Sequence, residues 1–379
     1  MFIRKTLKTF LSLSLLLALG AKAQQASPLD AMLPNDLLAK ARAEGKVTVY
    51  SLTKRISKVE EAFEAAYPGI DLEGIYLSSD KQIAQLKADA QAGRKGVDVI
   101  YISDAAQAIN ELVDTGLVER YIPPRVASRL DESSKTPLLA QRLSTKVLMY
   151  NEEAHPLLSP IDNIWELTLP QWRGKVYMVD PLKRSDYMDL LTEYVIRADV
   201  MESAYLAQFR KKLDLGTAKN AGERFIMDLY ANGLVLVDST DEVNNAVGKL
   251  GQIDPPVGFT SYSDRRDNAK EGWALQVSNA TTPSAGISFP AVLAIVKDTP
   301  HPAAARLFID FVMGDETQTG GAAYAPFYVA GDYATRTDIV THPDAMPLPN
   351  LGAWRTDPAT TAKTRGRVEA LIRELQQGR

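Results

Sequence analysis

Residues 46–77 read KVTVYSLTKRISKVEEAFEAAYPGIDLEGIYL and contain a complete strand–helix–strand pattern. The alternating apolar side chains of residues 46–50 are typical of a β-strand. The following stretch predicts a helix, because Ser57–Glu60 has the composition of a capping box. Pro68-Gly69 ends that helix, and residues 70–77 predict a second strand. This order is the building unit of an α/β fold.

The same order continues along the chain. A second capping box, Ser79–Gln82, precedes a helix that stops at Gly93. Residues 97–102 predict a third strand, and a helix that ends at Gly116 follows it. Strands that alternate with helices of this length predict βαβ units and a parallel sheet. Right-handed crossovers bring the loops after the strands to one edge of the sheet, where ligands bind in open α/β folds.

A second α/β unit is expected after Pro123-Pro124 and a polar stretch that ends at Thr136-Pro137. The expected elements are a strand at 145–150, a helix, turn and strand within 165–179, helices at 187–196 and 220–232, a buried strand at 234–237, a strand at 291–296, and helices at 302–313 and 363–377. The second unit therefore repeats the architecture of the first.

The N-terminus has the order of a secretory signal peptide. Arg4, Lys5 and Lys8 precede an apolar run at 10–19, and Ala21-Lys22-Ala23 forms a small-residue cleavage site. The apolar run is too short to span a bilayer as a helix. We therefore expect residues 1–23 to be a signal peptide, and the mature protein to reside in a Gram-negative periplasm without insertion into the membrane.

Composition narrows the classes of function. The chain has no cysteine, which excludes disulfides, thiolate catalysis and cysteine-ligated metals. Four of the 43 basic residues lie in the expected signal peptide, which leaves 39 basic against 47 acidic residues, a net charge of −8. This balance argues against binding to nucleic acid. About 356 mature residues suggest two domains.

Hydroxyl and charged side chains follow the predicted strands in both halves of the chain. Hydroxyls, cations and backbone N–H groups at helix N-termini form anion sites. The same residue types also serve as ordinary helix caps, and Ser57, Ser79, Asp104 and Thr240 are expected N-caps. Each residue taken alone is therefore compatible with a structural or a ligand-binding role. The candidate ligand-binding residues are Ser51, Thr53, Lys54, Arg55, Ser79, Asp104, Arg184, Ser185, Asp186, Tyr187, Asp238, Ser239 and Thr240.

Signals for enzyme chemistry are weak. His155, His301 and His342 each precede a proline, as is typical of turns, and none has metal-ligand spacing. The chain lacks the G-x-S-x-G elbow of serine hydrolases and the Gly-rich phosphate loop of NTPases. We therefore predict no catalytic residue, no metal site and no cofactor.

Several blocks give the chain a family resemblance. Residues 44–51, 63–70, 86–93 and 97–100 resemble the opening of family 1 extracellular solute-binding proteins. Residues 147–151, 172–176, 294–302 and 305–311 extend the likeness over about residues 38–333. The branch that the chain resembles most contains the periplasmic ferric-iron-binding and hexose-phosphate-binding proteins of ABC importers.

The resemblance implies an α/β, two-lobed periplasmic-binding-protein fold of type II, with two α/β domains joined by crossing hinge strands. The strand at 145–150 would cross between the lobes, and one near 288–296 would return. Lobe one would comprise residues 24–143 plus about 291–340, and lobe two residues 144–290 plus about 341–379. Such a protein traps its ligand by hinge closure.

The sequence departs from the ferric-iron binders, which carry adjacent tyrosines where this chain has Asp238-Ser239-Thr240. Basic, hydroxyl-rich loops instead favour an anionic solute, such as a sugar phosphate or an organophosphonate. Ferric iron, a polyamine or thiamine remain alternatives. The expected partner is an inner-membrane ABC permease or a sensor kinase, the expected state is a monomer, and a secreted hydrolase is the rival function.

Overall fold

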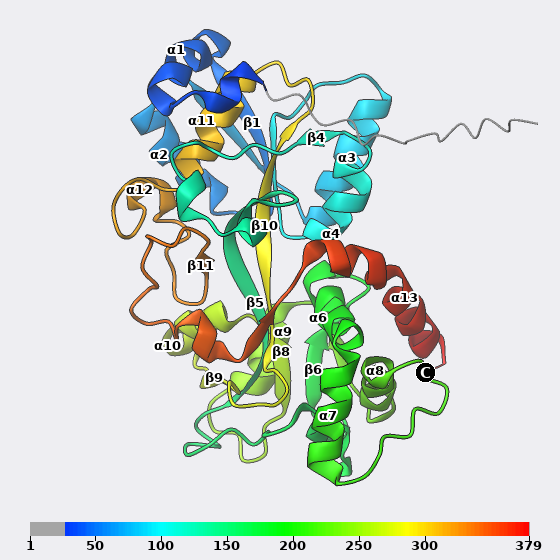
Figure 1. The fold of residues 1–379 in the computed structure, drawn as a ribbon. Coiled ribbons are helices and arrows are strands. Elements are labelled where there is room, and N and C mark those ends of the chain that lie inside the picture. Colours follow the sequence, from blue (N-terminus) through cyan, green and yellow to red (C-terminus); the bar gives the residue numbers. More distant parts are fainter. Residues whose placement is uncertain (1–26, 379) are drawn as a thin grey trace, which may run out of the picture.

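Two long strands cross the middle of the molecule and connect an upper and a lower group of elements (Figure 1). The computed structural model describes residues 27–378. The expected signal peptide, residues 1–23, lies outside the described residues. The crossing strands are β5 (Leu139–Asn151) and β10 (Gly286–Val296), which pair with each other in antiparallel orientation. This arrangement confirms the predicted two-lobed α/β fold with crossing strands.

Helices and strands alternate through most of the described chain. Within residues 27–378 the remaining strands are β1 (Lys46–Ser51), β2 (Asp71–Tyr76), β3 (Val99–Ile102), β4 (Val118–Glu119), β6 (Val176–Val179), β7 (Val235–Val237), β8 (Val257–Thr260), β9 (Leu275–Val277), β11 (Tyr333–Ala334) and β12 (Ala353–Arg355). The α-helices are α1 (Pro34–Glu44), α2 (Ile56–Ala66), α3 (Ser79–Gln91), α4 (Ala105–Ala108), α5 (Glu132–Lys135), α6 (Ser185–Ile196), α7 (Ala198–Phe209), α8 (Ala221–Ala231), α9 (Thr240–Gly248), α10 (Asn268–Glu271), α11 (Pro302–Val312), α12 (Gly321–Tyr324) and α13 (Pro358–Gln377).

The strands form one continuous sheet in the order β2-β1-β3-β10-β5-β8-β6-β7. The two ends of the sheet are parallel, as predicted: β1 pairs with β2 and β3, and β6 pairs with β7 and β8. The antiparallel pair β5 and β10 joins these parallel ends. The carboxyl ends of both parallel groups therefore face the middle of the molecule, where the crossing strands pass (Figure 1).

The upper part of the sheet is covered on both faces. β1 is buried along all but its first residue, as is typical of a parallel strand between two helical layers. Val49 and Phe63 belong to a core shared with α1, α2 and α11 on one face. Tyr50 and Ile100 belong to the core beneath α3 and α4 on the other face. This double cover positions the loops after β1 and β3 rigidly.

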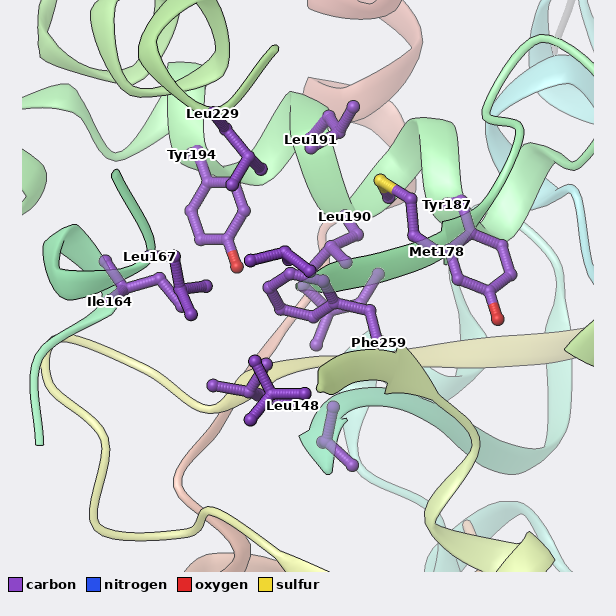
Figure 2. Close-up of a cluster of buried hydrophobic side chains, with 14 of the residues drawn as sticks. Leu148, Ile164, Leu167, Met178, Tyr187, Leu190, Leu191, Tyr194, Leu229 and Phe259 are labelled. Atoms are coloured by element: carbon purple, nitrogen blue, oxygen red, sulfur yellow. The ribbon is translucent and has the colours of Figure 1, made fainter. Parts of the chain in front are cut away.

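The lower part has a single large core (Figure 2). Leu148 and Phe259 contribute to it from β5 and β8, and Tyr187, Leu190 and Tyr194 contribute from α6. Tyr187 and Tyr194 are fully buried. Burial of aromatic side chains of this size supplies several kcal/mol of hydrophobic stabilisation, roughly 2 to 3 kcal/mol each. The core holds the first turn of α6 against the crossing strands.

Two helix starts differ from the predicted capping boxes. Ser57 lies inside α2 and donates to the Lys54 carbonyl, so it caps nothing. Ser79 is the first residue of α3 rather than its cap, and Gln82 donates to the carbonyls of the strand-end residues Leu77 and Tyr101. Both predicted capping boxes were therefore wrong: Ser57 bonds to the backbone of the preceding turn, and Ser79 and Gln82 bond to the neighbouring strand ends.

Other boundaries shifted by smaller amounts. Thr240 was expected to cap α9, but Ser239 is the cap and accepts from the Glu242 N–H. Asp104 caps α4 as predicted, accepting from the Gln107 N–H at 3.0 Å. β7 was predicted to be buried, but it is the edge strand of the sheet and is only half-buried.

Candidate ligand-binding site

A pocket of about 480 Å³ lies where the strand ends of both halves meet the crossing strands. Loops after β1, β2 and β3 close it from above, and loops after β6 and β8 close it from below. Its lining residues are Leu52, Thr53, Arg55, Tyr76, Ser78, Ser79, Asp80, Ser103, Arg142, Ser144, Lys146, Lys183, Arg184, Ser185, Asp186, Ser261, Ser263, Asp264, Arg266, Phe289 and Asp332. We call this the strand-end pocket.

The floor of the strand-end pocket is one face of β5. Arg142, Ser144 and Lys146 alternate along the strand, so their side chains point to the same side. The side chains of Arg142 and Lys146 are only 5% and 4% exposed. Cations this deeply buried require carboxylate partners, because desolvation of an unpaired charge is costly.

The first partner is Asp332, in the loop before β11. Arg142 lies 3.4 Å from Asp332 Oδ2, and Arg55, from the loop after β1, lies 2.7 Å from the same atom. Ser144 donates to the other carboxylate oxygen at 3.0 Å. Burial alone would raise the pKa of Asp332, but Arg142 and Arg55 lower it. We call Arg55, Arg142 and Asp332 the upper cluster.

The second partner is Asp186, in the first turn of α6. Lys146 lies 3.1 Å and Arg184 2.9 Å from Asp186 Oδ2. Lys146 also donates to Ser261 at 2.7 Å. Burial alone would raise the pKa of Asp186, but Lys146 and Arg184 together lower it to about 2. We call Lys146, Arg184 and Asp186 the lower cluster.

Positive charge remains at the two clusters of the pocket. The lining has six cationic residues, Arg55, Arg142, Lys146, Lys183, Arg184 and Arg266, and four carboxylates, Asp80, Asp186, Asp264 and Asp332. Lys183 and Arg266 pair with Asp238 and Asp267, which lie outside the lining. Within each cluster, one carboxylate faces two cations, so a positive charge remains at both ends of the floor. This arrangement favours a negatively charged ligand.

Hydroxyl groups cover much of the remaining wall. Ser79 accepts from the N–H groups of Ser103 and Asp104 and lies 3.3 Å from the Ser103 hydroxyl, which ties the start of α3 to the loop after β3. Ser185 begins the twelve-residue helix α6 and also lines the pocket. Hydroxyls and the N–H groups of a first helical turn can donate to anionic oxygens and to sugar hydroxyls.

The structure brings together six of the thirteen candidate residues. Thr53, Arg55, Ser79, Arg184, Ser185 and Asp186 line the strand-end pocket. Ser51 is fully buried, and its hydroxyl donates to the Thr53 carbonyl. Lys54 lies over the Tyr76 ring at 5.7 Å, outside the lining. Tyr187 is buried behind the pocket, beneath Lys146.

The other candidates lie elsewhere. Asp238 is exposed and pairs with Lys183 at 2.5 Å, while Ser239 and Thr240 begin α9 outside the pocket. Asp104 lines a second, adjoining pocket of about 660 Å³, formed by α4, α13 and the loop before α6. There Asp104 pairs with Arg365 at 2.6 Å, and Arg365 also lies 3.6 Å from Asp189.

Several lining residues were not predicted. Arg142, Ser144 and Lys146 could have been identified from the sequence, because charged or polar side chains recur there at every second position of a strand. Ser261, Ser263 and Asp264 follow β8, which was not among the predicted strands, so the rule that selected the other strand ends did not reach them. Asp332 has no local signal, since its partners Arg55 and Arg142 are distant in sequence.

Metal ligands are not grouped in the described part of the chain. Among residues 27–378, no group of three or more His, Cys, Asp or Glu side chains is arranged to hold a metal ion. Tyr76 is the tyrosine in the lining of the strand-end pocket. No helix within the same residues is both long and apolar enough to cross a membrane.

Comparisons with known proteins agree with this fold. The bacterial extracellular solute-binding protein family matches residues 46–320. Iron-bound HitA from Pseudomonas aeruginosa has a similar structure, with 16% identity, a TM-score of 0.68 and coverage of 87% of this chain and 99% of that one. No curated protein matches the sequence.

Two further structures are similar. The periplasmic binding protein AfuA from Actinobacillus pleuropneumoniae, with exogenous fructose-6-phosphate bound, has 17% identity, a TM-score of 0.63 and coverage of 87% of this chain and 97% of that one. The Trichodesmium protein IdiA (FutA), in complex with iron and citrate, has 13% identity, a TM-score of 0.62 and coverage of 87% and 99%.

The chain has the two-lobed α/β fold of solute-binding proteins, with a pocket between its two halves. The chain belongs to the bacterial extracellular solute-binding protein family, whose members are the binding components of ABC importers. The predicted family resemblance is thereby confirmed.

Proposed function

We propose that this protein captures a small anionic solute in the periplasm and delivers it to the permease of an ABC importer. Sugar phosphates and organophosphonates are the classes that the strand-end pocket suits best. The observation that carries this proposal is that each buried cluster in the lining has two cations against one carboxylate. Hydroxyls such as Ser79, Ser103 and Ser261 supply partners for a sugar.

The proposal includes hinge closure across the crossing strands. Thr53, Arg55 and Ser79 come from the upper half, while Arg184 and Ser261 come from the lower half. A solute that contacts both sets is held only when the halves approach, so it favours the closed state. Separate hydrophobic cores above and below support the predicted lobes, 24–143 with about 291–340 and 144–290 with about 341–379.

Several further parts of the proposal follow from the family. The signal peptide at residues 1–23 would direct the chain to the periplasm, where the closed form, as a monomer, would be recognised by the permease. Presentation of the solute to a sensor kinase is the alternative partnership. Because the pocket holds its charges in ion pairs and lacks a histidine in its lining, we propose binding without catalysis.

Ferric iron is the second candidate solute, because HitA and IdiA are structures with iron bound. Tyr76 would then have to act with Asp80 or Asp264, the carboxylates of the lining that lie outside the two clusters. The paired tyrosines expected of ferric binders are replaced by Asp238-Ser239. The lining therefore favours an anion over the iron cation.

Native mass spectrometry of protein purified from the periplasm tests the solute class. We expect a bound mass that fits a phosphorylated or phosphonate compound. Calorimetry then tests the site: Arg184→Ala should weaken binding of fructose 6-phosphate, or of the solute found, by about 1 to 3 kcal/mol, because a charge-assisted hydrogen bond is lost.

Arg120→Ala is the matched control, since Arg120 is exposed and lies outside the strand-end pocket. Its affinity should equal that of the wild type. Equal affinities for Arg184→Ala and wild type would remove Arg184 from the site. Tight ferric binding without anion binding would replace the proposed solute by iron.

A further inference from the structure

The upper and lower clusters repeat the same arrangement. In each cluster, a buried cation of β5 and a cation from a strand-end loop contact one carboxylate oxygen. The β5 cations, Arg142 and Lys146, are four residues apart on one face. Their Cα atoms are therefore about 13 Å apart, given the rise of a β-strand. Two similar anion-attracting ends thus lie at a fixed separation.

Each end keeps one positive charge after internal pairing. Asp332 neutralises one of its two cations, and Asp186 does the same at the other end. Because Arg142 and Lys146 are buried, water screens their charges poorly, and an anionic group of a ligand gains more there than at the surface. A solute with one anionic group satisfies one end and leaves the other uncompensated.

The floor between the clusters is neutral. Ser144 lies between Arg142 and Lys146 on β5, and Phe289 is its partner in the register of β10. Both side chains line the pocket. A ring and a hydroxyl suit a carbon skeleton that carries hydroxyl groups. The floor is therefore charged at its ends and uncharged at its centre.

We propose that the solute carries two anionic groups, one bound at each cluster, joined by a neutral or hydroxylated carbon skeleton. Sugar bisphosphates and phosphorylated sugar acids belong to this class. The inference rests on the proposed function and narrows its solute class. A volume of about 480 Å³ lies within the range of small-molecule sites and accommodates such a molecule.

A series of α,ω-alkanediphosphonates of increasing chain length tests the proposal without assuming a skeleton. Calorimetry should show tighter binding for diphosphonates than for alkylmonophosphonates of equal length, by about ten- to a hundredfold, with an optimum at one chain length. Fructose 1,6-bisphosphate should likewise bind more tightly than fructose 6-phosphate or fructose 1-phosphate.

Two variants and a control complete the test. Arg55→Gln weakens the upper cluster and Arg184→Gln the lower one, and each should abolish the advantage of the second phosphonate. Arg120→Gln should preserve it. Melting temperatures would verify that each variant is folded. We expect both to fold, because Asp332 still pairs with Arg142 in Arg55→Gln and Asp186 still pairs with Lys146 in Arg184→Gln.

The outcomes separate this inference from the proposed function. Equal binding of mono- and diphosphonates would refute the two-anion solute and leave an anion receptor in place. Absence of binding by every anion of the series would refute both proposals. A length optimum that survives in both variants would show that the clusters are not the binding ends, and would also overturn the inference.

Discussion

Asp186 is buried between Lys146 and Arg184, and these cations hold its pKa near 2 against the opposing effect of burial. A carboxyl group whose pKa is lower in the folded than in the unfolded chain stabilises the fold above the unfolded pKa, about 3.8. That contribution, roughly 2 kcal/mol, is lost as the pH falls from about 4 towards 2.

Asp186→Asn removes the titrating group. The variant should be less stable than wild type by about 3 kcal/mol at pH 7, because two buried cations lose their carboxylate.

Urea unfolding at pH 7, 5, 4 and 3 checks this prediction. The difference between wild type and Asp186→Asn should narrow below pH 4, as the wild-type carboxylate becomes protonated. Asp254→Asn is the control, because Asp254 is an exposed carboxylate paired with Lys175. A difference that stays constant over the whole pH range would contradict the assigned role of Asp186.

Single residues also show where sequence reasoning works and where it ends. Arg184, Ser185 and Asp186 could be predicted, because they follow a recognisable strand and begin a recognisable helix. Ser79 was found for the wrong reason, since its hydroxyl bonds to the loop after β3 instead of capping α3. Asp332 could not be predicted, because its meaning depends on contacts with residues nearly two hundred or more positions away.

At the scale of elements, helix α8 packs directly on the backbone of α6. A Cβ atom at Gly222 would lie 2.1 Å from the carbonyl oxygen of Tyr194, a contact that only movement of a helix can relieve. Gly222→Ala should therefore destabilise the protein by about 3 kcal/mol, the upper range for overpacking. Thermal or urea unfolding would measure the loss.

Gly366, inside α13, provides the matched comparison. A Cβ atom there meets nothing within 4 Å, so Gly366→Ala should raise stability by about 0.5 to 1 kcal/mol through the higher helix propensity of alanine. If both substitutions had similar effects, close packing of α8 on α6 would not explain the glycine at position 222.

The crossing strand β5 illustrates what element prediction misses. Its lower half, 145–150, was expected from the apolar pattern, but the strand begins at Leu139. Gln141, Arg142 and Ser144 interrupt the apolar pattern, although all three belong to the strand. Arg142 and Ser144 line the strand-end pocket, while Gln141 is buried, accepts from the Tyr101 hydroxyl and donates to the Val312 carbonyl. Polar contacts therefore replace the apolar pattern that identifies buried strands.

At the scale of the whole molecule, two structural bodies share one sheet. The upper cores draw on residues before 144 and after 290, while the lower core draws mainly on the residues between. The upper body uses two separate parts of the chain because the chain crosses the middle on β5 and returns on β10. The overall architecture was predictable because the blocks that carry the family resemblance lie in both halves. The placement of one cluster from each half on the same pocket was not, because it depends on how the halves face each other.

Closure of the two halves is the last prediction. The chain has no native cysteine, so Glu61→Cys on α2 and Glu202→Cys on α7 would each carry one dye without interference. Both positions are exposed and outside the strand-end pocket, in the upper and lower halves respectively. The anion that binds most tightly in the calorimetric series should raise the transfer efficiency between the dyes and reduce the radius of gyration in X-ray scattering, because only the closed state lets the pocket loops of both halves contact it. The same labelled pair carrying Arg184→Ala should need a higher concentration of that anion for the same response.

Saturating binding with unchanged transfer efficiency and unchanged scattering would show that the halves are rigid. Capture of the solute would then have to occur in a preformed pocket.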